Sequence, residues 1–130
     1  MRPEYPKFQD SVSEYLIRHR SILDVLTKLQ EANARVNRAV AKSVTNCGCV
    51  KINAGRQTAP ADISYSDIKS FMNNHLNGEL CEHCRDILET ELGHNLFYLA
   101  ALCDLLGLKL SDVMQKEQSR LATLGVFNLT

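Results

Sequence analysis

Four of the five cysteines fall in two tight pairs, and this spacing restricts the fold more than any other feature of the chain. One residue separates Cys47 from Cys49, and two residues separate Cys81 from Cys84. Thiolates spaced this closely can bind one ion without unwinding the chain around them. We therefore expect the two pairs to meet in a four-cysteine metal site, with zinc as the default ion and an iron–sulfur cluster as the alternative.

Other uses of these thiols remain open. The first residues carry neither a basic nor an apolar leader pattern, so we expect a cytoplasmic protein in which disulfides are disfavoured. A reduced or redox-active set of thiols competes with the metal interpretation, and so does a nucleophilic Cys84 with a histidine partner. An ion with an open position would act as a Lewis acid, with His83 or His94 carrying protons. Cys103 lies in an apolar run and is expected to be a buried hydrophobe.

Length and charge point to one neutral domain over residues 1–130. The chain has 15 basic and 15 acidic residues and a formal net charge of zero. DNA or an anionic membrane surface would require a positive stripe, so the charge balance disfavours nucleic acid and membranes as partners. The sequence also contains no apolar stretch of the length that crosses a membrane.

Hydrophobic spacing predicts an all-α fold with a cysteine-bearing loop. Apolar residues recur at three- and four-residue steps in two long segments, with an expected break near Arg20 and Ser21 in the first. The second should bury a stripe formed by Leu88, Leu92, Leu96, Leu99, Cys103 and Leu106. Residues 45–63 are expected to form a loop that is extended at 50–52, with 81–84 completing the cysteine region. The expected helices are residues 9–44, 64–78 (burying Ile68, Phe71, Met72 and Leu76), 80–106 and 111–121.

A second group of polar side chains lies on the two long helices. Glu91 and His94 share one helix face, and Glu31, Arg35 and Arg38 share a face on the other. Antiparallel packing would bring Glu31 opposite Glu91, and paired carboxylates suit Mg²⁺ and thereby phosphate. The alternative is that these residues are solvated polar groups at the margin of a helical bundle.

Two segments resemble MazG-like nucleoside triphosphate pyrophosphohydrolases. The more specific one is residues 91–113, ELGHNLFYLAALCDLLGLKLSDV, and the fainter one is residues 28–39, KLQEANARVNRA. The resemblance implies a four-helix-type core completed by a homodimer or homotetramer, and cleavage of a nucleotide to its monophosphate and pyrophosphate with Mg²⁺. Glu31, Glu91 and His94 would then be the catalytic positions, and Arg35 or Arg38 would contact phosphate. The cysteine region would be an insert, since it is not part of the usual family pattern.

The acidic motifs of that family are incomplete here. At the positions of its EExxE pattern this chain has Gln30, Glu31 and Ala34, and at those of its ExxD pattern it has Glu91 and His94. Two of the five metal carboxylates therefore remain. A site reduced in this way should bind Mg²⁺ poorly, and an imidazole suits zinc better. Two interpretations follow: a divergent MazG-like pyrophosphohydrolase, or a non-catalytic, zinc-stabilised helical scaffold or binding module.

Overall fold

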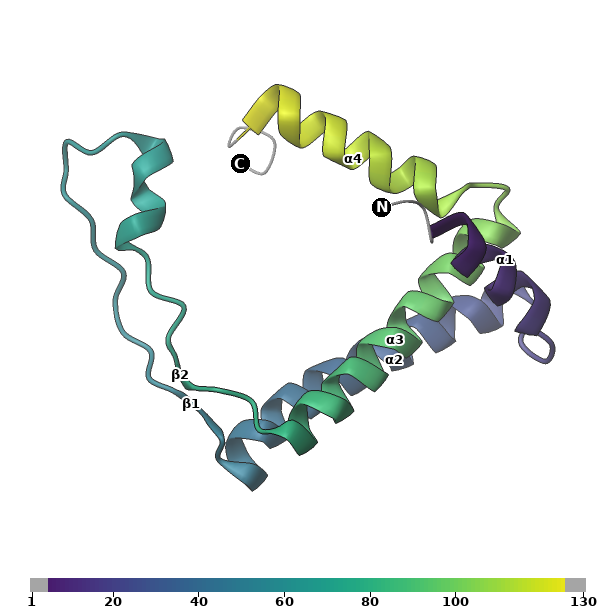
Figure 1. Ribbon diagram of the computed structural model, residues 1–130, viewed down its shortest axis with the longest axis horizontal. Helices are drawn as coiled ribbons and strands as arrows, with labels where there is room; N and C mark the ends of the chain where they lie inside the picture. The colour runs from purple at the N-terminus through teal and green to yellow at the C-terminus, as the bar shows by residue number, and fades with distance from the viewer. Residues whose placement is uncertain (1–4, 126–130) are drawn as a thin grey trace.

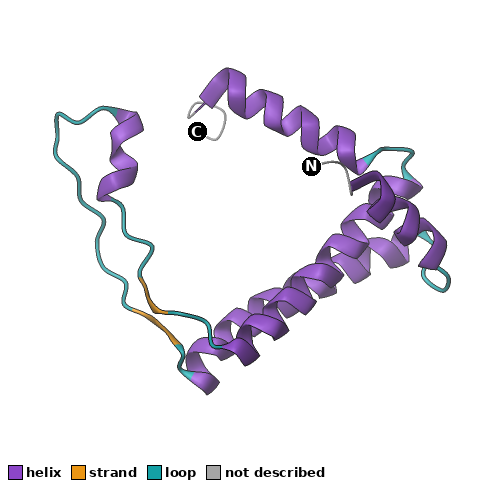
Figure 2. Cartoon of the chain, viewed as in Figure 1, coloured by secondary structure: helices purple, strands orange, loops and turns teal. Residues whose placement is uncertain are grey.

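The computed structural model describes residues 5–125 and is mostly helical, as the sequence predicts (Figure 2). One two-stranded antiparallel sheet interrupts the helices between α2 and α3. No helix in the described part of the chain combines the length and apolar character needed to cross a membrane. The elements in order are α1 (Tyr5–Tyr15), α2 (Ile22–Lys42), a π-helical turn (Ser43–Cys47), β1 (Val50–Ile52), a 3-10 helix (Tyr65–Phe71), β2 (Leu76–Gly78), α3 (Glu82–Leu105) and α4 (Leu110–Leu124).

The two long helices α2 and α3 lie side by side as an antiparallel hairpin (Figure 1). The chain breaks before α2, close to the predicted position, and Ser21 then caps the helix by accepting a hydrogen bond from the Leu23 backbone N–H. Val25 and Ala32 on α2 and Leu88 on α3 are buried. At the far end of α3, the left-handed Gly107 follows the helix, as the predicted stop requires.

A small core joins α1, α2, α3 and α4 at the end of the hairpin away from the cysteines. Its members are Val12, Leu16, Val25, Ala100, Ala101, Cys103 and Leu110. The buried amide of Gln9 donates to the Leu108 carbonyl at 2.8 Å and accepts from the Leu110 N–H at 2.7 Å. This side chain therefore satisfies the start of α4, which begins one residue before the predicted Ser111.

The predicted buried stripe of α3 is wrong for a single copy of the chain. Leu88 and Cys103 are buried, but Leu92, Leu96 and Leu99 are 46, 48 and 37% exposed, and Leu106 is exposed as well. The periodicity correctly identified a helix, but α2 and α1 pack against α3 from other directions. Part of the α3 stripe thus remains open in one copy.

The cysteine-bearing segment forms an arm that projects from the hairpin (Figure 1). Strands β1 and β2 pair with Val50 opposite Gly78 and Ile52 opposite Leu76, which confirms the extended stretch expected at 50–52. The Gln57 side chain bridges the two sides of the arm, donating to the Asn73 carbonyl and accepting from its N–H.

The short helix expected at 64–78 is wrong. Only Tyr65–Phe71 is helical, as a 3-10 helix with no buried residue, and Leu76 lies in a strand. Phe71, Met72 and Leu76 are exposed and Ile68 is half-buried, because no other element covers this part of the arm. The Asn73 and Asn74 side chains accept backbone N–H bonds two residues ahead, a local pattern that competes with helix.

Candidate metal centre

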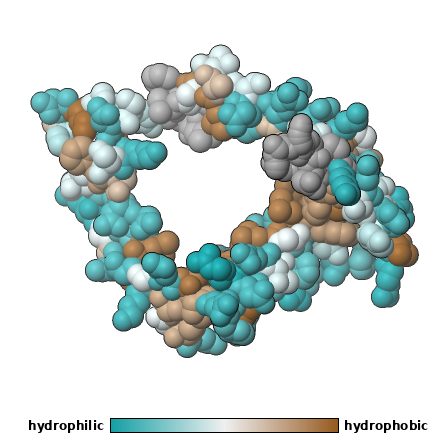
Figure 3. Space-filling model, in the orientation of Figure 1, coloured by the Kyte–Doolittle hydropathy of each residue, from teal (hydrophilic) through white to brown (hydrophobic). Residues whose placement is uncertain are grey.

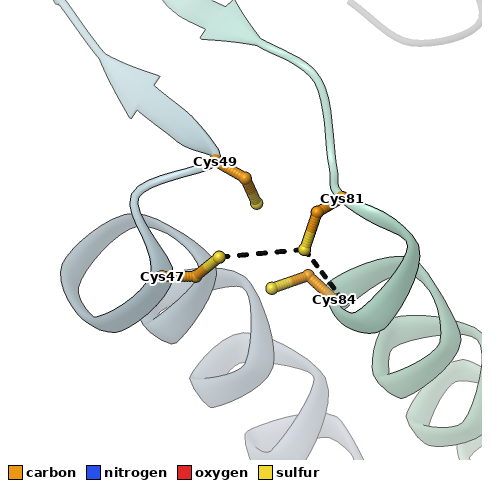
Figure 4. Close-up of side chains that lie close together, drawn as sticks. All are labelled: Cys47, Cys49, Cys81 and Cys84. Atoms are coloured by element: carbon orange, nitrogen blue, oxygen red, sulfur yellow. Dashed lines mark hydrogen bonds between the residues drawn. The ribbon is translucent and has the colours of Figure 1, made fainter.

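The four paired cysteines meet where the arm joins the helical hairpin (Figure 4). Cys47 ends the π-helical turn after α2, and Cys49 directly precedes β1. Cys81 is the N-cap of α3, and Cys84 lies in the first turn of that helix. All four Sγ atoms lie within 4.8 Å of one another, and those of Cys47 and Cys81 are 3.7 Å apart. The prediction that the two pairs come together is therefore confirmed.

Two glycines shape the backbone around the sulfur atoms. Gly48 has a φ of +79° and ends the π-helical turn in the left-handed conformation, which lets the chain reverse between Cys47 and Cys49. Gly78 has a φ of +87°, and a Cβ there would lie 2.5 Å from the Cys49 carbonyl oxygen. Only glycine allows β2 to pass this close to the first cysteine pair. Gly48 and Gly78 therefore help to position the cysteine ligands.

The pKa values of the two thiols at the start of α3 shift in opposite directions: that of Cys81 falls and that of Cys84 rises. The Cys84 backbone N–H donates to the Cys81 sulfur at 3.4 Å, and this bond lowers the pKa of Cys81 to about 7. Desolvation raises the pKa of the Cys84 thiol to about 12, and its sulfur neighbours add to the rise. These directions describe the thiols alone, since a bound cation favours the thiolate at each of its ligands.

The donor set and its spacing fit a single tetrahedral ion. Zinc–thiolate bonds of about 2.3 Å place sulfur atoms about 3.8 Å apart in a regular tetrahedron. The 3.7 Å between Cys47 and Cys81 matches this edge, and 4.8 Å bounds every other pair. An iron–sulfur cluster spreads its thiolates over two or more irons and so needs a wider set. The four cysteines could thus hold a metal ion such as zinc, with only thiolates as ligands.

His83 lies beside this centre without joining it. It lines a cavity of about 260 Å³ with Cys47 and Cys84, and its side chain is exposed. The group of converging ligand atoms contains no histidine or carboxylate in the described part of the chain. A tetrahedral ion held by four sulfurs therefore has no open position next to His83.

The polar residues of the long helices meet at a second place, halfway along the hairpin. Glu31 and Arg35 of α2 and His94 of α3 line a cavity of about 470 Å³. Lys28, Ala32, Phe97 and Tyr98 complete its lining. Lys28 was not among the predicted site residues, although it lies three residues before Glu31 on the same face of α2. Arg38 is exposed and does not line this cavity.

The two predicted carboxylates differ in their surroundings: Glu31 is ion-paired, and Glu91 lies near a histidine. Glu31 contacts Lys28 at 3.2 Å and Arg35 at 3.6 Å, and the hydrogen bond from Lys28 lowers its pKa. Glu91 is 20% exposed, and its Oε1 lies 3.7 Å from Nδ1 of His94. That distance is too long for a hydrogen bond, and this buried oxygen has no such partner among the described residues.

Within residues 5–125, the four cysteines are the only group of three or more His, Cys, Asp or Glu side chains that lie close enough together to share one ion. Glu31, Glu91 and His94 do not form a second one. No protein-family model, no curated protein and no solved structure gives a significant match to the chain.

Proposed function

We propose that this protein is a zinc-stabilised helical scaffold, in which Cys47, Cys49, Cys81 and Cys84 hold one structural ion. The observation that carries the proposal is the convergence of four Sγ atoms within 4.8 Å at the junction of the arm and the hairpin. Four thiolates complete the coordination shell of a tetrahedral ion, and closed sites of this kind stabilise folds rather than bind substrate. A reducing cytoplasm suits this role because the thiols stay reduced there.

The ion would tie three parts of the molecule together. Its ligands come from the end of α2, the start of β1 and the start of α3, so it fixes where the arm leaves the hairpin. The strands of the arm pair over only three residues each, and the arm's 3-10 helix has no buried residue. A sheet this small is marginal on its own. The metal would therefore supply the rigidity that the arm's own contacts do not.

Limited proteolysis tests the structural role. Trypsin can cut the arm after Lys51, Arg56 and Lys69. We expect these sites to be resistant in the metal-loaded protein, cleaved after a chelator removes the ion, and resistant again after zinc is restored. Cleavage at the same rate with and without bound zinc would contradict the role of the ion in holding the arm.

A second candidate function is a MazG-like nucleotide pyrophosphohydrolase at the mid-hairpin cavity. Two observations favour it. Glu31, Arg35 and His94 line one cavity between the antiparallel helices, and the buried Oε1 of Glu91 has no hydrogen-bond partner within residues 5–125. The cations would face the phosphates, and the aromatic rings of Phe97 and Tyr98 would face the base. Glu91 does not line this cavity, but it lies beside His94, which does, and it would be the carboxylate that accepts Mg²⁺ or a bound water.

The Glu91→Gln variant tests this second function. Cleavage of nucleoside triphosphates with Mg²⁺ or Mn²⁺ should fall about 100-fold or more, as expected when a metal ligand is lost. The Glu89→Gln variant changes an exposed carboxylate on the same helix and should leave the rate unchanged. Cleavage that survives Glu91→Gln would show that the site is misassigned. A wild-type protein without cleavage would exclude the enzyme and leave the scaffold.

A further inference from the structure

The arm meets the helical hairpin at its base, where the four cysteines lie. Figure 3 shows an opening between the rest of the arm and the long helices. Among the residues of β1, β2 and the arm's 3-10 helix, only Val50 is buried, and it directly follows Cys49. The state of the sulfur ligands at this base therefore decides how firmly the arm is held.

Two of the four sulfur atoms are well placed to bond to each other. The Sγ atoms of Cys47 and Cys81 point towards one another and are 3.7 Å apart (Figure 4). A disulfide bond is about 2.05 Å long, a separation that rotation of the two side chains can reach. Cys47 is exposed and Cys81 is half-buried, whereas Cys84 is buried and the Cys49 thiol donates to the Ser43 carbonyl at 3.8 Å. Cys47 and Cys81 are therefore the pair most available for oxidation.

A cavity gives small molecules access to the Cys47 sulfur. Cys47 and Cys84 line it together with the exposed His83, and its volume is about 260 Å³. A water molecule occupies about 30 Å³ in the liquid, and hydrogen peroxide is only about twice as large. A metal ligand is held as its thiolate, the form of cysteine that attacks peroxides. Cys47 would thus be ready to react at a place that a small oxidant can reach.

We propose that Cys47 and Cys81 form an oxidation site for hydrogen peroxide, at which a new disulfide releases the zinc ion and loosens the arm. The Cys47 thiolate attacks one peroxide oxygen, the O–O bond breaks, and the departing hydroxide takes a proton from solvent. The Cys81 thiolate then attacks the sulfur of the resulting sulfenic acid, and the S–O bond breaks with loss of a second hydroxide, which is also protonated. Two thiolates lose two electrons, and one peroxide becomes two water molecules.

The disulfide would preserve one connection and break another. It joins the end of α2 to the N-cap of α3, two positions 34 residues apart, so it closes the same loop as the ion and keeps the hairpin together. Two of the four ligands are then lost, and Cys49 is no longer held to the centre. Because Cys49 directly precedes β1, the arm loses its tie to the helices. This consequence depends on the proposed zinc centre, since without an ion only the disulfide would form.

Zinc release and thiol loss are measured together on the metal-loaded protein. One equivalent of hydrogen peroxide should release the ion to a chromogenic indicator. The thiols that react after denaturation should fall from five to three per chain, because the bond uses two. The buried Cys103 should stay unmodified. Dithiothreitol followed by zinc should restore all five thiols and the bound ion. A fall to one thiol would mean that each cysteine pair closes on itself, which would overturn the proposal.

Trypsin identifies the new bond. After oxidation, limited digestion should cut the arm at Lys51 and Lys69, as it does after chelation, but residues 1–51 and 70–130 should stay joined on a gel run without reductant. Chelated protein should give separate fragments on the same gel. Complete digestion should then yield residues 43–51 linked to residues 70–85, and fragmentation in the mass spectrometer should place the bond on Cys47 and Cys81. A bond to Cys49 or Cys84 would overturn the assignment.

Two histidine variants separate the reacting pair from the other ligands. Histidine can replace a cysteine as a zinc ligand, so Cys47→His and Cys49→His should both bind the ion before oxidation. Peroxide should release zinc from Cys49→His, which keeps the reacting pair, and should leave it bound in Cys47→His. Equal release from the two variants would overturn the proposal. If either variant fails to bind zinc, the position of the bond in the wild-type chain decides.

Metal analysis before peroxide is added separates the two proposals. A wild-type chain without zinc would contradict the zinc-stabilised scaffold and, with it, oxidative release. A wild-type chain that binds zinc and keeps it after peroxide would overturn the oxidation site alone.

Discussion

Replacing Cys84 with alanine should remove one of the four sulfur ligands and release the ion. Cys84 is buried, with 7% exposure, and it lies on the first turn of α3. Three thiolates cannot close a tetrahedral site, so the arm would no longer be tied to the end of α2 by a filled coordination shell. The change should therefore lower the free energy of unfolding by more than the deletion of one buried sulfur atom alone would.

The expected size follows from the length of chain that the ion closes. Cys47 and Cys81 are 34 positions apart in the sequence. Treated as a cross-link between them, the ion would remove loop entropy worth about 4 kcal/mol from the unfolded state. With an unfolding entropy of about 2.1 cal/mol/K per residue, this corresponds to a fall in Tm of about 15 °C.

The chain contains a matched control for the cysteine change. Cys103 lies on the same helix, is also 7% exposed and belongs to the apolar core rather than to the metal centre. Cys103→Ala therefore carries the cost of deleting a buried thiol without the loss of a ligand. Urea and thermal unfolding, monitored by circular dichroism at one protein concentration, should place Cys84→Ala about 4 kcal/mol below Cys103→Ala. Fixing the concentration excludes effects of assembly.

A chelator provides the second half of this test. It should destabilise the wild-type and Cys103→Ala proteins, and it should have no effect on Cys84→Ala, which has no ion left to lose. Equal stability of the two variants, together with a wild-type protein that is insensitive to chelation, would refute the structural ion.

Three further predictions concern other residues. Gly78→Ala should weaken zinc binding, measured by competition with a chromogenic chelator, because the new Cβ would force β2 away from Cys49. Gln9→Leu should cost about 2–3 kcal/mol in urea unfolding, since it removes the partner of the buried Leu110 N–H and of the partly buried Leu108 carbonyl. Burial raises the pKa of the Cys103 thiol, so at alkaline pH after chelation Cys81, whose pKa is lowered to about 7, should react with iodoacetamide before Cys103 does. The rate of Cys103 should rise only on unfolding, where the lower pKa yields more thiolate; prompt alkylation in the folded chain would contradict its burial.

Local signals predicted much of the helical part. The spacing of apolar residues indicated both long helices, the break before α2 and the end of α3 near residue 106. The structure accounts for these two boundaries by local cap chemistry at Ser21 and Gly107. The cysteine pairs indicated a long-range contact, because soft ligands at this spacing have few other uses in a reducing compartment. The structure bears out this contact, since the four Sγ atoms lie close enough together to bind one ion.

The failures have a common physical cause, since periodicity does not say what covers an apolar face. Leu92 and Leu96 share a stripe with the buried Leu88, but in one copy no element packs over them. Phe71 and Met72 matched the buried face of a helix, yet they lie exposed at the end of the 3-10 helix. The cap of α4 was missed because it comes from the distant Gln9.

The most direct test of the zinc-stabilised scaffold is metal analysis of the purified protein combined with absorption spectroscopy at the metal edge. A closed structural site should contain one zinc ion per chain, surrounded by four sulfur atoms at about 2.3 Å. A protein that folds without metal and leaves its four paired cysteines free to react would contradict this site. Iron with a second metal nearby, or a zinc shell containing oxygen or nitrogen, would equally contradict a closed site of four cysteine ligands.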